Sequence, residues 1–147
     1  MKKVGKSSKK GFTLVELIVV LVILAVLAAM LVPALVGYID RAKKEKEFQA
    51  ASTIYTAAQA LATEAYGKGD TAPQFADMSD VEELTGITNA KITEVTYGTG
   101  TDISKYTIQK ITVEIGGNKY YYQVGATTWG TDGYPTVTSN TQGGTTT

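Results

Sequence analysis

Residues 9–37 read KKGFTLVELIVVLVILAVLAAMLVPALVG, a basic pair followed by a long apolar segment. Sixteen consecutive apolar residues occupy positions 17–32, and the apolar character between positions 12 and 36 is interrupted only by Thr13, Glu16 and Pro33. As a helix, residues 12–36 would be about 37 Å long, at about 1.5 Å per residue, whereas the hydrocarbon core of a bilayer is about 30 Å thick. The sequence therefore predicts a helix that can span a membrane.

Three interpretations of this segment compete: a cleaved secretory signal, a plain membrane anchor, or a segment that is first inserted and later extracted into an assembly. A secretory signal ends in small residues before its cleavage site, but this chain stays apolar through Val36 without a clear A-x-A site. A plain anchor leaves Glu16 unexplained, because a carboxylate inside lipid is costly. Five Lys precede the segment and four basic residues soon follow it, an excess that slightly favours a cytoplasmic N-terminus.

The nine residues from Lys9 to Leu17, with the long apolar helix and Pro33 inside it, resemble the class III signal of type IV pilins and pseudopilins. The likeness combines a short basic leader, a Gly-Phe junction, a Glu four residues beyond the junction and an uninterrupted apolar run, and it covers about residues 1–60. It implies that a prepilin peptidase removes residues 1–11 by cutting between Gly11 and Phe12. It also implies methylation of the new amine on Phe12.

The resemblance also bears on Glu16 and on the pair Pro33 and Gly37. In the family, the acid corresponding to Glu16 is thought to pair with the N-terminal amine of an adjacent subunit, and a helix would place it on the same face as Phe12, about 6 Å along the axis. The alternative is a carboxylate that snorkels towards the headgroups. Pro33 lacks an amide hydrogen and Gly37 is a poor helix former, so we expect the helix to kink or loosen there. That weak point either lets a filament bend or has no mechanical role.

The next part of the chain, residues 38–66, predicts a continuing amphipathic helix. It is rich in Ala, contains no Pro or Gly, and repeats apolar residues with a period of 3.6 at Phe48, Ala51, Tyr55, Ala58, Leu61 or Ala62, and Ala65. Gly67 is the expected C-cap. The sequence Ser79-Asp80-Val81-Glu82 has the spacing of a capping box and predicts a short helix that ends at Gly86. Calcium binding is a weaker interpretation of the acids in this region, which are Asp77, Asp80, Glu82 and Glu83.

Three segments then have the character of strands: residues 92–97, 106–115 and 119–124. Residues 116–118, Gly-Gly-Asn, predict a tight hairpin turn between the last two segments. The fold class expected is α+β, a long N-terminal helix whose membrane-spanning half is followed by an amphipathic half packed on a small antiparallel sheet. The expected organisation is a leader at 1–11, a membrane or filament-core helix at 12–37, a globular head at 38–125, and a Thr/Gly-rich loop or tail at 126–147.

Several aromatic residues, Tyr120, Tyr121, Tyr122, Trp129 and Tyr134, allow either a binding surface or simple strand-forming preference, and the second explanation is the more economical. The chain has no Cys and no His, so it lacks the commonest nucleophile and base pairs, and we expect no enzyme, no cofactor and no metal centre. Without residues 1–11, nine basic residues face fourteen acidic ones, a balance that argues against nucleic-acid binding.

The expected function is that of a structural subunit in a type IV pilus-like filament. By the resemblance, its partners are prepilin peptidase, other pilin subunits, the membrane before assembly, an inner-membrane assembly platform and a cytoplasmic assembly ATPase. The subunit would lie in the cell membrane before assembly and in an extracellular filament afterwards. Two alternatives remain: a minor pseudopilin of a competence or type II secretion system, and an anchored binding protein that does not polymerise.

Overall fold

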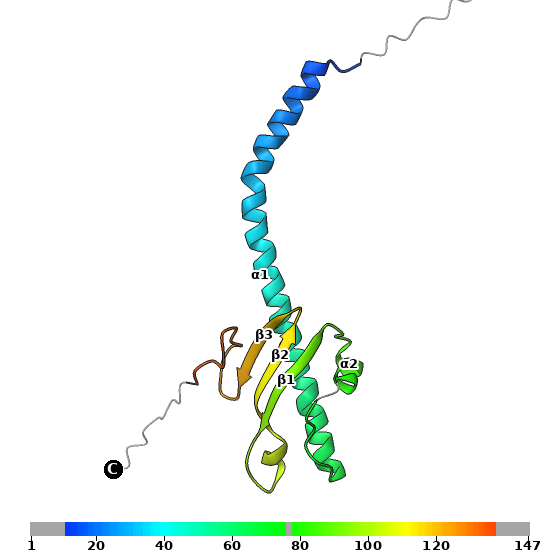
Figure 1. Ribbon diagram of the computed structural model, residues 1–147, viewed down its shortest axis with the longest axis vertical. Coiled ribbons are helices and arrows are strands. Elements are labelled where there is room, and N and C mark those ends of the chain that lie inside the picture. The colour runs from blue at the N-terminus through cyan, green and yellow to red at the C-terminus, as the bar shows by residue number, and fades with distance from the viewer. Residues whose placement is uncertain (1–10, 76–77, 138–147) are drawn as a thin grey trace, which may run out of the picture. The chain divides into compact units, whose positions relative to one another are not determined.

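The computed structural model describes residues 11–75 and 78–137, and its chain divides into two units, one ending at Lys43 and one beginning at Lys44. Helix α1 (Leu14–Lys68) contributes to both units, and Figure 1 shows the order of the elements that follow it. Each unit is described separately. Residues 1–10 of the expected leader, which include Lys9 and Lys10, and residues 138–147 lie outside the described part of the chain.

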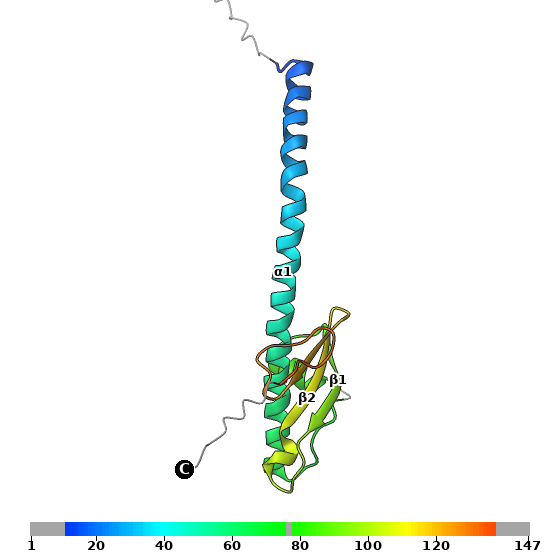
Figure 2. The ribbon, with the colours of Figure 1, turned by 90° about the vertical axis from the view of Figure 1, so that its left-hand side faces the viewer.

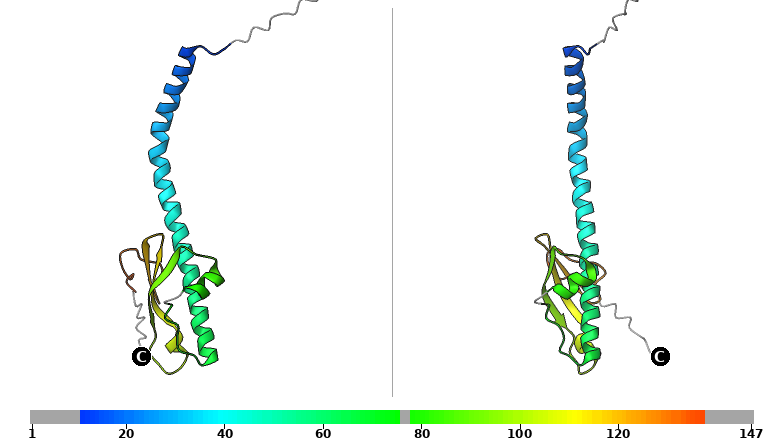
Figure 3. Two further views of the ribbon diagram at one scale, coloured as in Figure 1. Left: turned by 45° about the vertical axis from the view of Figure 1, so that its right-hand side comes forward. Right: turned by 90° about the vertical axis from the view of Figure 1, so that its right-hand side faces the viewer.

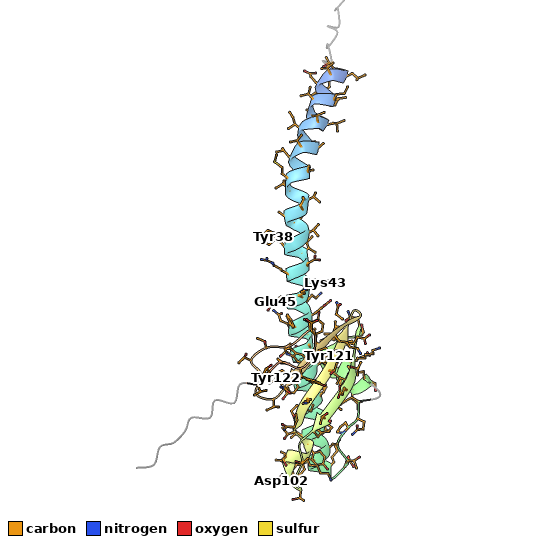
Figure 4. All side chains as sticks on the ribbon, turned by 60° about the vertical axis from the view of Figure 1, so that its left-hand side comes forward. Tyr38, Lys43, Glu45, Asp102, Tyr121 and Tyr122 are labelled. Atoms are coloured by element: carbon orange, nitrogen blue, oxygen red, sulfur yellow. The ribbon has the colours of Figure 1, made fainter. Side chains whose placement is uncertain are left out.

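The described part of the first unit, residues 11–43, contains the apolar part of α1. This part is long and apolar enough to cross a membrane, and none of its most apolar window is buried. The large apolar side chains from Phe12 to Ile39 are all between 50% and 84% exposed, and Figure 4 shows them projecting around the helix. The predicted apolar helix is thus confirmed, and its large apolar side chains stay exposed among the residues that the structure describes.

Pro33 lies inside α1, and the helix continues through Pro33 and Gly37 without a break. Figure 1 shows the apolar part of α1 gently bowed, whereas the view in Figure 2 shows it nearly straight. Pro33 removes one backbone hydrogen-bond donor, and Gly37 has more backbone freedom than other residues. The expectation that the helix loosens at these positions stays a prediction.

The second unit contains the C-terminal part of α1 and a three-stranded antiparallel sheet in the order β1-β2-β3. The strands are β1 (Ala90–Tyr97), β2 (Ile108–Ile115) and β3 (Asn118–Gln123), with a short helix α2 (Ser79–Thr85) before the sheet and a 3-10 turn (Ile103–Tyr106) between β1 and β2. The α+β class is confirmed. The sheet lies along one side of this part of α1, as Figures 1 and 3 show from different directions.

The core of the second unit lies between α1 and the sheet. The helix contributes mainly alanines and Ile54, and the sheet contributes branched residues and Tyr120. The predicted helical stripe is confirmed at Ala51, Ala58, Ala62 and Ala65, although the period also includes Ile54, which is completely buried. Because most of the buried side chains on the helix are small, Ile54 and the strand residues supply most of the buried volume of this core.

Strand β1 contains a bulge that keeps its apolar residues on the core side. Ile92 pairs with Val113 and Glu94 pairs with Thr112, so Thr93 is the extra residue. Side chains alternate along a regular strand, and residues three apart would face opposite sides. The bulge therefore places both Ile92 and Val95 on the face that packs against α1.

The hairpin between β2 and β3 is one residue shorter than predicted. Ile115 pairs with Asn118, which makes Asn118 the first residue of β3 and leaves only Gly116 and Gly117 in the loop. Their φ angles are +56° and +87°, the left-handed values that a two-residue I′ turn requires at both positions. Two other expected boundaries also move, because β2 begins at Ile108 and β1 at Ala90.

The ends of the helices differ from the expected caps. Helix α1 ends at Lys68, and the left-handed residue is Gly69, not Gly67. The Asp70 amide donates to the Ala65 carbonyl at 2.9 Å and the Gly69 amide to the Tyr66 carbonyl at 3.1 Å, which together form a Schellman motif. At α2 the cap position is Met78, with no side-chain cap bond, so the predicted box with Ser79 as cap is wrong by one position.

Gln59 fixes the register between α1 and the start of β2. Its side-chain oxygen accepts from the Ile108 amide at 2.8 Å, and its side-chain nitrogen donates to the Tyr106 carbonyl at 3.0 Å. Both backbone groups lie just where the strand begins and would otherwise lack strand partners. The side chain therefore satisfies the end of β2 from the helix.

Candidate processing and assembly site

The candidate site is the segment from Gly11 to Glu16, where the extended chain enters helix α1. Residues 11–13 are not helical and α1 begins at Leu14, so Thr13 occupies the N-cap position. The Leu17 amide donates to the Thr13 carbonyl at 3.3 Å, the first turn of helical bonding. Phe12 precedes the cap, which corrects the expected one-turn helical spacing from Phe12 to Glu16.

Glu16 and Thr13 form a capping box. The Glu16 carboxylate accepts from the Thr13 amide at 2.8 Å and from the Thr13 hydroxyl at 2.9 Å, while the Glu16 amide donates to the Thr13 hydroxyl oxygen at 3.3 Å. This arrangement satisfies backbone amides that the first turn of a helix leaves without partners. The negative charge also lies at the positive end of the helix dipole.

The role of Thr13 was missing from the sequence prediction. The signal for it exists in the sequence, because Thr13-Leu14-Val15-Glu16 has the T-x-x-E spacing of a capping box just before an apolar run. The same spacing was identified at Ser79, where the structure does not form it in that register. In residues 13–16 the resemblance assigns Glu16 to a contact with the N-terminal amine of an adjacent subunit, which is a different role from capping.

The capping box leaves acceptor capacity on Glu16. A carboxylate has about four lone-pair positions, and the two bonds from Thr13 converge on one of its two oxygens. The site is exposed, and Phe12 is 84% exposed. Glu16 is therefore held in one orientation while it can still accept from a further donor, such as an ammonium group.

Gly11 and Gly37 are not required by the fold of a single chain. A side-chain carbon placed at either position would meet no atom within 4 Å, and neither residue has a left-handed φ angle. The fold itself requires glycine where the φ angle is left-handed, as at Gly116 and Gly117, or where a side-chain carbon would collide with backbone, as at Gly130. Any requirement for glycine at positions 11 and 37 therefore comes from outside the single chain.

Among the described residues, no group of three or more His, Cys, Asp or Glu side chains is arranged to hold a metal ion. Of the acids considered for calcium, Asp77 lies outside the described part of the chain. Asp80 and Glu82 lie in the first turn of α2, where acids favour the helix dipole.

Comparison with known proteins gives one match, which falls on the candidate site. No curated protein and no solved structure is significantly similar to the chain. Residues 6–32 match the family described as the prokaryotic N-terminal methylation motif, a span that includes Gly11, Phe12, Thr13 and Glu16. The chain therefore carries an N-terminal methylation motif, consistent with the class III signal of a type IV pilin or pseudopilin precursor.

Proposed function

We propose that this chain is the prepilin of a type IV pilus-like filament, cut between Gly11 and Phe12, methylated on the amine of Phe12 and polymerised through α1. The observation that carries the proposal is the methylation motif at residues 6–32 at the start of an apolar helix that is unburied in a single copy. Membrane anchoring follows from the motif and the helix together. Assembly into an extracellular filament is the further step that is proposed.

The exposed apolar helix needs two different environments in turn. Fully burying a Val, Leu or Ile side chain is favourable by about 1.5–3 kcal/mol, and this helix exposes such residues on every side. Lipid can cover them before assembly, and the equivalent helices of neighbouring subunits can cover them in a filament. Because both environments are apolar, extraction from the membrane exchanges one for the other at little net cost.

Glu16 supplies the specificity that an apolar helix lacks. Cutting after Gly11 would create a positive amine on Phe12, one residue before the cap formed by Thr13 and Glu16. A neighbouring subunit's amine can use the acceptor positions that Thr13 leaves open, which fixes the axial register between subunits. In an apolar bundle the attraction is partly offset by desolvation, so we expect Glu16 to control recruitment more than filament stability.

Partners follow from this sequence of steps. Prepilin peptidase would accept the chain at Gly11, where the lack of a side chain has no purpose in the fold itself. Pro33 and Gly37 would loosen α1 when subunits pack, an effect the single helix does not display. An inner-membrane platform and a cytoplasmic ATPase would drive extraction. We propose no enzymatic activity for the chain, since it contains neither Cys nor His.

The test of the proposal is Glu16→Leu in a strain with an active assembly machine. We expect normal membrane insertion and normal cleavage, with filaments reduced at least tenfold in the sheared surface fraction. Glu16→Gln keeps the hydrogen-bonding shape without the charge, so it separates the capping role from the ionic role. A Glu16→Leu chain that functions normally, with no filaments in the sheared fraction of either the variant or the parent strain, would instead indicate an anchored protein that does not polymerise.

The same strain distinguishes a major subunit from a minor pseudopilin of a competence or type II secretion system. Overproduction of a major subunit should lengthen homopolymeric filaments in proportion to its amount. A minor subunit would leave filament length unchanged and would appear only in small amounts in the sheared material.

A further inference from the structure

A groove of about 430 Å³ lies between α1 and the loop that follows β3, within the second unit. Its α1 wall contains the exposed polar residues Gln49, Ser52 and Thr56. Its other wall is the segment from Ala126 to Trp129, and Tyr122 of β3 lies between the two walls. The volume falls within the range of about 300–1,000 Å³ that is usual for small-ligand sites.

Three aromatic rings form a continuous row along this groove. Tyr55 and Tyr122 have ring centroids 5.0 Å apart, and Tyr122 and Trp129 have centroids 5.2 Å apart with an angle of 33° between their planes. All three rings are only partly buried, so part of each is available to solvent. Figure 4 labels Tyr122 and the preceding residue of β3, Tyr121. A row of accessible rings offers an apolar surface with polar tips.

The polar groups around the rings are all uncharged. No Asp, Glu, Lys or Arg lines the groove, whose remaining polar side chains are the hydroxyls of Ser52, Thr56, Thr127 and Thr128 and the amide of Gln49. The Thr56 hydroxyl donates to the Ser52 carbonyl at 3.0 Å, and its oxygen can still accept a hydrogen bond. Such a site gains nothing from an ionic ligand. It suits a molecule that combines an apolar face with many hydroxyl groups.

We propose that this groove binds a neutral oligosaccharide, with pyranose rings stacked on Trp129 and Tyr122 and their hydroxyls bonded to the Ser, Thr and Gln side chains. A pyranose presents C–H groups on its faces and hydroxyls around its edge, which matches rings lined by neutral donors and acceptors. The apolar helix of a second copy matches less well, because it would leave those polar groups without partners. This proposal does not depend on polymerisation.

Trp129 is the only Trp of the chain, so its fluorescence reports directly on the groove. The full chain is purified in a polyoxyethylene detergent, because sugar-based detergents would compete for the site. Cellohexaose, chitohexaose and maltohexaose are titrated separately, with tetragalacturonate as the charged counterpart. We expect a saturable change in emission with at least one neutral hexasaccharide and a response at least tenfold weaker with tetragalacturonate.

Two neighbouring helix positions provide a matched pair of variants. Ser52→Lys places a charge in the groove wall, and Thr53→Lys places the same charge at the next exposed residue, which does not line the groove. Both keep Trp129 as the reporter. We expect Ser52→Lys to weaken binding at least fivefold and Thr53→Lys to leave it within twofold. Trp129→Leu, measured by calorimetry, should abolish the binding.

Three results would overturn the proposal. The first is no saturable response to any of the three neutral hexasaccharides. The second is equal weakening by Ser52→Lys and Thr53→Lys, which would mean that the response arises elsewhere. The third is an emission change that depends on protein concentration without sugar and is removed by Ser52→Lys, which would assign the groove to a second copy of the chain.

Discussion

The Glu16 carboxylate accepts two hydrogen bonds from a single residue, Thr13, at 2.8 Å from its amide and 2.9 Å from its hydroxyl. The acid that the resemblance assigns to contacts between subunits therefore already has a partner in its own chain. The two roles are compatible, because Thr13 orients the carboxylate without using all of its acceptor positions. The capping box thus holds Glu16 in a defined position within the single chain, where it is available for the contact between subunits proposed above.

Thr13→Ala should weaken the start of α1. The substitution removes the hydroxyl that both donates to and accepts from Glu16, and loss of such a cap costs about 1 kcal/mol. We expect faster amide hydrogen exchange at residues 14–17 of the full chain in micelles, by about fivefold, with no change in the second unit. Thr13→Ser keeps the hydroxyl and should exchange as the parent chain does; equal exchange in all three chains would contradict the capping role.

A second relationship holds the hairpin to the helix in the second unit. Glu47 is 7% exposed, and its carboxylate accepts from the Asn118 side chain and from the Tyr120 hydroxyl. These partners lie 71 and 73 residues further along the sequence, respectively. Tyr120→Phe would remove one donor to a buried carboxylate, which costs about 1–3 kcal/mol. We expect the midpoint of denaturant unfolding of the full chain to fall accordingly, with an unchanged fold by circular dichroism.

The control for that change is the double variant Glu47→Gln with Tyr120→Phe. A neutral amide is less costly to bury than a carboxylate, so the double variant should lose less stability than the sum of the two single variants. Additive losses would show that Glu47 and Tyr120 do not act on each other.

The stability of the second unit should fall at high pH. Burial, together with the Glu47 carboxylate, raises the pKa of Tyr120 to about 12, and burial raises the pKa of Tyr97 to about 12, from an ordinary value of 10.0. Between about pH 10 and 12 the tyrosine of the unfolded chain loses a proton that the folded chain keeps. The contribution of that tyrosine to the free energy of unfolding is therefore complete below about pH 10 and is lost as the pH rises through about 12.

For the almost fully buried Tyr120, the free energy of unfolding should fall by at most about 1.4 kcal/mol per pH unit in this range. Denaturant unfolding of the full chain across this range measures it, with tyrosinate absorbance as a parallel record of ionisation. Tyr120→Phe should flatten the slope. A parent chain whose stability is constant from about pH 10 to 12 would contradict the burial argument.

Two glycines provide a test of backbone conformation without steric interference. A side-chain carbon at either Gly67 or Gly117 would meet nothing within 4 Å, but Gly117 has a φ angle of +87° and Gly67 is helical. Gly117→Ala should destabilise by about 1–2 kcal/mol, because a left-handed residue with a Cβ is strained. Gly67→Ala should stabilise by about 0.4–1 kcal/mol. Shifts of the same sign in thermal unfolding would contradict this account.

The parts of the fold that depend on local pattern could be predicted from the sequence. The apolar run predicts α1, the alternation at Ile111, Val113 and Ile115 predicts β2, and Gly116-Gly117 predicts the hairpin. Boundaries moved by one or two residues because they depend on cap geometry and strand pairing, as at Gly69 and Asn118. The packing of Tyr120 in the core could not be read from a run of three tyrosines.

Features that depend on distant contacts were not predictable in the same way. Glu47 lies in a charged stretch typical of a solvated surface, and only the hairpin that folds over it makes it buried. The loop after β3 was expected either to follow the surface or to be a tail. Its described residues follow the surface, because Gly130 pairs with Tyr121 and Tyr134 packs on the same ring. The rest of that segment, residues 138–147, lies outside the described part of the chain.

The most direct test of the central claim is the intact mass and N-terminal sequence of surface-sheared material from cells that express the chain and an active prepilin peptidase. The account predicts a mature form that begins at Phe12, carries one additional methyl group and is recovered with the filaments. An uncut chain that retains residues 1–11 and is found only in the membrane fraction would contradict it.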